Sequence, residues 1–179
     1  IEVLGPPPTS GTRDAFAELA MEGGAEAFPM LKDLKAKDEK ALKAARHALR
    51  EDGAYIEAGE NDNLIVQKLE ASPNALGVFG YSFLDQNSDQ IQGSLVGNVE
   101  PTFDNIASAK YGISRSLYFY VKKSHIGQVP GIKEYIAEFT SDAAAGEEGY
   151  LADKGLIPLT DAERKGVRAG ALALNNLSL

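Results

Sequence analysis

A serine, a glycine and a threonine follow a run of prolines near the start of the chain, in the stretch GPPPTSGTRDAF. Backbone amides at the start of a helix have no partner inside the helix, and the helix dipole places partial positive charge there. Glycine lets an anion approach the backbone closely, hydroxyls add donors, and a guanidinium can pair with an oxyanion. The pattern is therefore compatible with an anion site formed by Thr9, Ser10, Gly11, Thr12 and Arg13.

The same turn has a second interpretation. Ser10 is a good N-cap, so the turn could do no more than begin a helix. It lacks the Gly-Lys-Ser/Thr of a nucleotide-binding P-loop. A later loop, AGENDNL, offers Asn61 and Asp62, which could face a cleft or cap a helix. Capping is the favoured interpretation there, because a carboxylate beside an anion would repel it.

The elements that position the turn are short apolar runs alternating with amphipathic ones. IEVLG, GAYIEAG and ALGVF predict buried strands, and IQGSLVGNVEP and SRSLYFYVKK predict two more. The first helix follows the turn and is expected to stop at Gly23 and Gly24. Further helices are expected in DEKALKAARHALRED, NDNLIVQKLEAS, TFDNIASAKYG (capped by Thr102), GIKEYIAEFTSD, AAAGEEGYLADKG and DAERKGVRAGALAL. This alternation predicts an α/β fold.

The amino-acid composition argues against several classes of function. The chain has 179 residues and a net charge of −8, which argues against nucleic acid or an anionic membrane as a partner. It contains no cysteine, so disulfides and thiolate chemistry are excluded. Its histidines, His47 and His125, have no further histidine or cysteine at metal-ligand spacing, so neither a metal nor a cofactor is expected.

Three blocks, GPPPTSGTRDAF, REDGAYIEAGENDNLIVQKLEASPNALGVFGYSFL and SRSLYFYVKKSH, together resemble the phosphate-binding subunit of bacterial high-affinity phosphate ABC importers. The resemblance covers essentially the whole chain. It implies a two-lobed periplasmic receptor of the type II periplasmic-binding-protein class, with mixed sheets flanked by helices. Such receptors close on their ligand by hinge bending and would here deliver inorganic phosphate to the importer's membrane subunits.

The resemblance also implies particular ligands. The Ser-Gly-Thr turn is the family's phosphate-binding signature, which carries over to Ser10, Gly11 and Thr12. Some members place an arginine four residues before the serine, where this chain has Pro6. Others place it directly after the threonine, so Arg13 is the expected cationic ligand.

By the same resemblance, residues 1–115 form the middle, phosphate-binding lobe, and residues 116–179 belong to another, incomplete lobe. The segment that precedes IEVLG in the family is missing from this sequence, so we expect the missing N-terminal segment or a second copy of the chain as a partner.

A binding protein is expected rather than an enzyme. A phosphatase would need a nucleophile with a base, or a metal cluster, and neither is visible around Ser10 in the sequence. A receptor for another oxyanion, sulfate or molybdate, is the alternative that the turn leaves open. An acidic chain can still hold an anion, because backbone dipoles and hydrogen bonds act at short range.

Overall fold

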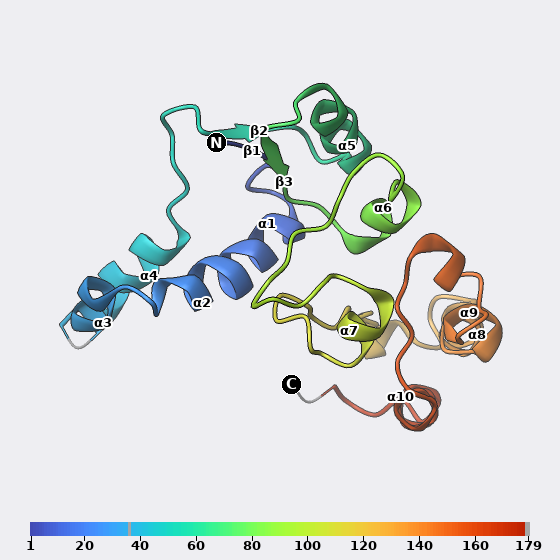
Figure 1. Ribbon diagram of the computed structural model, residues 1–179. Coiled ribbons are helices and arrows are strands. Elements are labelled where there is room, and N and C mark those ends of the chain that lie inside the picture. Colours follow the sequence, from blue (N-terminus) through green and yellow to red (C-terminus); the bar gives the residue numbers. More distant parts are fainter. Residues whose placement is uncertain (36, 178–179) are drawn as a thin grey trace. The chain divides into compact units, whose positions relative to one another are not determined.

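The computed structural model describes residues 1–35 and 37–177 (Figure 1). Contacts divide the chain into two units, one of Ile1–Pro101 with Tyr111–Arg115 and one of Thr102–Lys110 with Ser116–Leu179. The predicted assignment of residues 1–115 and 116–179 to two lobes of a receptor stays a prediction. Among the described residues, no helix has the length and apolar character needed to cross a membrane.

The first unit contains a small sheet (Figure 1). Its strands are β1 (Glu2–Gly5), β2 (Tyr55–Glu57) and β3 (Ala75–Gly77), in the order β2-β1-β3. Both pairings are parallel, with Val3 opposite Tyr55 on one side and Leu76 on the other. The α/β class and the three strands are confirmed, but the expected mixed sheet is wrong, since the strands described here are all parallel. Parallel strands need crossover connections, and helices provide them.

Helices follow each strand of this unit. A continuous helical run begins after β1, and it is made of α1 (Gly11–Ala15), the π-helical η1 (Phe16–Met21) and α2 (Glu22–Ala25). The predicted stop at Gly23 and Gly24 is wrong, because both lie inside α2. The run ends shortly before Pro29, which begins the next helix and disfavours helical backbone in the residue before it. The other helices are α3 (Pro29–Lys35), α4 (Glu39–His47), α5 (Asp62–Ala71) and α6 (Tyr81–Gln86).

The core of the first unit lies between the sheet and α5. Ile65 of α5 is completely buried and packs with Leu4 of β1 and with Ala58, just after β2. Gly77 of β3 lets this helix come close, because a Cβ atom there would lie 2.6 Å from Cδ1 of Leu69. The packing fixes α5 against the sheet, and with it the loop that connects β2 to α5.

The second unit is helical. Its helices are α7 (Phe103–Ala107), η2 (Lys123–His125), α8 (Ile132–Phe139), α9 (Asp142–Ala145), η3 (Ala152–Lys154) and α10 (Asp161–Leu172). Thr102 caps α7 as predicted, since its side chain accepts from the Asn105 amide at 3.3 Å. Arg168 joins α10 to α8 by donating to the Ala137 carbonyl at 2.7 Å.

Two predicted strands are not formed. SRSLYFYVKK has no strand pairing, and the side chains of its central residues, Leu117 to Tyr120, are exposed by 42–75%. Phe119 does contact the rings of Tyr135 and Phe139 on α8. In IQGSLVGNVEP, the described pairing is one isolated bridge between Val96 and Val99. The helix expected in AAAGEEGYLADKG is reduced to the short α9 and η3.

Candidate functional site

Three loops meet at one edge of the sheet (Figure 1). Each strand is followed by a short loop and then by a helix, so that α1, α5 and α6 all begin there. Because the strands are parallel, their carboxyl ends share this edge. The chain places β2 on one side of β1 and β3 on the other, and ligands of open α/β sheets bind at such a switch point.

The Ser-Gly-Thr turn begins the first of these helices. Ser10 is the N-cap of α1, and its hydroxyl oxygen accepts from the Thr12 amide at 3.2 Å. The Ser10 carbonyl accepts from the Arg13 amide at 3.1 Å. The Gly11 amide has no acceptor among the described residues. The turn is therefore capped, as its second interpretation held, and still presents a free amide at the helix start.

Contacts with β2 hold the approach to this turn. The hydroxyl of Tyr55 donates to the buried Pro6 carbonyl at 2.9 Å. The ring of Tyr55 packs directly against the backbone of Gly5. Thr9 donates its hydroxyl hydrogen to the carboxylate of Glu60, in the loop after β2. These contacts fix the loop after β1 against β2 and the loop that follows it.

Arg13 also faces β2. Its Nη1 donates to Oε1 of Glu57 at 2.8 Å, and its guanidinium lies 5.4 Å from the centre of the Tyr55 ring. The side chain of Arg13 is 21% exposed and that of Glu57 52%. Burial raises the pKa of the Tyr55 hydroxyl; Arg13 opposes that shift and Glu57 adds to it. In this arrangement the predicted cationic ligand is paired with a carboxylate.

Asn61 and Asp62 begin α5 at the same sheet edge. The Asn61 side chain caps the helix, accepting from the Asn63 amide at 3.1 Å. The Asp62 carboxylate accepts from the amide of Gly80, the N-cap residue of α6, also at 3.1 Å. Burial raises the pKa of Asp62, and the Gly80 hydrogen bond acts in the opposite direction. Both side chains thus have hydrogen-bond partners within the fold. The bond from the Gly80 amide to the Asp62 carboxylate connects the start of α6 to the start of α5.

Arg115 is a neighbour of the turn that the sequence did not reveal. Its Nη2 donates to the Gly11 carbonyl at 3.0 Å, across a separation of 104 residues. In the sequence this arginine stands only as the start of an apolar segment, and no motif links it to the turn. Spatial proximity alone brings it to the predicted site.

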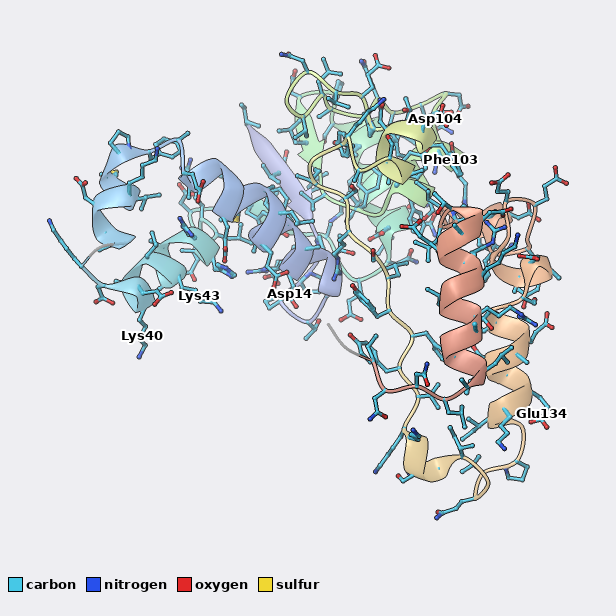
Figure 2. The ribbon with its side chains drawn as sticks, turned by 90° about the horizontal axis from the view of Figure 1, so that it is seen from below. Asp14, Lys40, Lys43, Phe103, Asp104 and Glu134 are labelled. Atoms are coloured by element: carbon cyan, nitrogen blue, oxygen red, sulfur yellow. The ribbon has the colours of Figure 1, made fainter. Side chains whose placement is uncertain are left out.

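The first unit also has a hollow whose lining includes none of the residues of the turn. It has a volume of about 700 Å³ and is lined by residues of α2 and α4, among them Lys40 and Lys43, which are labelled in Figure 2. Glu22, also in its lining, contacts His47, and the hydrogen bond from this histidine lowers the pKa of Glu22. Within the described residues, no three His, Cys, Asp or Glu side chains gather as metal ligands would.

The parallel sheet, with helices starting at its carboxyl edge, defines an α/β fold. Residues 1–143 match the family described as PBP superfamily domain, and the chain belongs to this superfamily. The resemblance inferred from the sequence is thereby confirmed at the level of the family.

Curated relatives share parts of the chain. It is 31% identical over 103 residues to the phosphate-binding protein PstS of Staphylococcus haemolyticus, covering 54% of this chain and 33% of that protein. It is 26% identical over 159 residues to the PstS proteins of Staphylococcus saprophyticus and Staphylococcus epidermidis, covering 85% of this chain and 41% and 40% of theirs. The chain thus spans about a third to two fifths of the length of these relatives. No solved structure gave a significant match.

Proposed function

We propose that this chain binds inorganic phosphate at the carboxyl edge of its parallel sheet, for delivery to an ABC importer, without converting it chemically. One observation carries the proposal: a Ser-Gly-Thr turn begins a helix at the switch point of the sheet and leaves the Gly11 amide free. Membership of the PBP superfamily, and curated relatives named phosphate-binding protein, support phosphate as the ligand.

The donors at this turn suit a tetrahedral oxyanion. The Gly11 amide and the hydroxyl of Thr12 donate to it, and the Ser10 hydroxyl keeps its hydrogen for the ligand, because only its oxygen is used by the Thr12 amide. Thr9 and Arg13 are the other proposed ligands. They are held by Glu60 and Glu57, so phosphate has to displace two carboxylates to engage them.

The proposed setting is the periplasm, with the membrane subunits of the importer as partners. A single lobe forms one wall of a cleft. Because the chain aligns with only part of its relatives' length, we propose that the opposite wall is supplied by the missing N-terminal segment or by a second copy of the chain.

Calorimetric titration tests this function. We expect heat of binding with inorganic phosphate, weaker or absent binding of sulfate and molybdate, and no turnover of a phosphate ester. Preferential binding of sulfate or molybdate would assign the site to another oxyanion, and hydrolysis of the ester would identify an enzyme. If none of these ligands bound, the proposal would be wrong.

A further inference from the structure

Two arginines lie beside the Ser-Gly-Thr turn, and their surroundings differ. Both belong to the first unit. Arg13 forms an ion pair with Glu57 and lies over the Tyr55 ring. Arg115 instead donates to a neutral acceptor, the Gly11 carbonyl, from an exposed position. Its Nη2 would lie 3.6 Å from a Cβ atom at Gly11, so the guanidinium touches the very residue whose amide is free.

The charge of Arg115 is not balanced by a carboxylate within the described part of the chain, where its hydrogen bond is to the Gly11 carbonyl. A guanidinium has five N–H donors, and this bond uses one of them. The sequence around it is also free of acidic residues, since no Asp or Glu occurs from Asn105 to Lys133.

We propose that Arg115 is a cationic ligand of the oxyanion held at the Ser-Gly-Thr turn. The inference rests on the proposed function and adds to it a residue from a distant part of the chain. A phosphate oxygen carries negative charge that the Gly11 carbonyl lacks, so the Arg115 guanidinium is attracted more strongly to phosphate than to this carbonyl. Arg13 has to leave the Glu57 carboxylate to make the same contact, which gives it less to gain.

This assignment distinguishes the two arginines at the turn. Arg13 is bound to Glu57 at the end of β2 and becomes a ligand only when it leaves this carboxylate. Arg115 supplies positive charge that no carboxylate of the described residues neutralises, and its planar fork can bind two oxygens of one anion.

The test compares Arg115→Gln with Lys122→Gln. Glutamine at 115 removes the charge, and because its side chain is shorter it also loses the contact with the Gly11 carbonyl, so urea denaturation of each variant shows whether the fold is intact. Lys122→Gln removes the same charge from an exposed position in the second unit. Inorganic phosphate is titrated calorimetrically into each protein, and the Nε–Hε signals of the wild-type arginines are followed by NMR.

We expect Arg115→Gln to weaken phosphate binding about ten- to a hundredfold, the scale of a lost charge-assisted hydrogen bond. We expect Lys122→Gln to bind as the wild type does, and the Arg115 signal to shift with phosphate. Equal affinity of Arg115→Gln and wild type would overturn the assignment while leaving the proposed function intact. Equal losses in both variants would also overturn it, because they would show an effect of net charge. A wild type that binds no phosphate would overturn both proposals.

Discussion

Gly5 and Tyr55 show how one residue shapes the candidate site. A Cβ atom at Gly5 would lie 2.2 Å from the Tyr55 hydroxyl oxygen and 2.7 Å from its Cζ, closer than real contacts allow. The tyrosine cannot move away without losing its hydrogen bond to Pro6 and its place under Arg13. Gly5 is therefore needed for the close approach of the ring, and the ring in turn holds the loop that leads to the turn.

We expect Gly5→Ala to lower the free energy of unfolding by about 1–3 kcal/mol, the usual cost of overpacking. Gly166→Ala is the matched control, since nothing lies within 4 Å of a Cβ atom there and the residue is inside α10. That substitution should raise the free energy of unfolding by about 0.5–1 kcal/mol, because alanine favours helices. Urea denaturation measures both, and equal effects in the two variants would show that the Tyr55 contact is unimportant.

The pair between Arg13 and Glu57 offers a second test at this scale. If Arg13 contributes to phosphate binding, Glu57→Gln should release it and raise phosphate affinity a few-fold. The free energy of unfolding should change by no more than about 1 kcal/mol, as is typical of exposed pairs. Arg13→Ala should weaken binding by about 1.5–3 kcal/mol. Calorimetry measures both affinities, and unchanged values in both variants would remove Arg13 from the set of ligands.

Asp62 makes stability depend on pH. Since burial raises its pKa, the folded chain holds this proton more tightly than the unfolded chain does. The contribution of Asp62 to the free energy of unfolding therefore falls as the pH rises from 3.8, the ordinary pKa of aspartate, through the raised pKa of the folded chain. At higher pH this loss of stability stays constant.

Asp62→Asn removes this titration and keeps an acceptor for the Gly80 amide. We expect the free energy of unfolding of the variant, relative to wild type, to increase with pH across that interval and then to level off. Urea denaturation between about pH 3 and about pH 7 follows the difference. A difference that decreases with pH would mean that the two helix starts stabilise the carboxylate more than burial penalises it.

At the scale of elements, the proposed phosphate site lies at the start of a helix. The effect of a capping side chain on stability can be measured separately from its effect on phosphate binding. Ser10 caps α1, and Thr160 caps α10 together with Glu163 in a reciprocal capping box. We expect Ser10→Ala and Thr160→Ala each to lower the free energy of unfolding by about 1 kcal/mol. Only Ser10→Ala should also weaken phosphate binding, about fivefold. Thermal denaturation measures the change in stability, and calorimetry measures the phosphate affinity. An unchanged phosphate affinity in Ser10→Ala would show that Ser10 only caps the helix.

Elements could be predicted from sequence where a local pattern determines them. Apolar runs ended by glycine marked β1 and β3, and Thr102 marked the start of α7. SRSLYFYVKK was predicted as a strand from its β-forming residues, but a strand also needs a partner, and no strand lies beside this segment within the described residues. Glycines at 23 and 24 did not end the first helix, because a helix tolerates glycine at a modest cost.

At the scale of the whole molecule, the Ser-Gly-Thr motif indicated where a site could lie. The residues that contact the motif and its neighbours come from distant parts of the sequence. The bonds from Thr9 to Glu60, from Arg13 to Glu57 and from Arg115 to Gly11 join residues 51, 44 and 104 positions apart. No periodicity or spacing encodes such contacts. The first two follow from the pairing of β1 with β2, which places the loops after these strands at one edge of the sheet.

The central claim is that inorganic phosphate binds at the start of α1. The most direct measurement is a titration of the ¹⁵N-labelled chain with phosphate up to millimolar concentration, followed through the amide signals in NMR spectra. Phosphate binding at this site predicts that the amides of Gly11 and Thr12 shift most, and that sulfate at equal concentration and ionic strength shifts them less. Unchanged Gly11 and Thr12 signals, or shifts confined to α4 around Lys40 and Lys43, would contradict the claim.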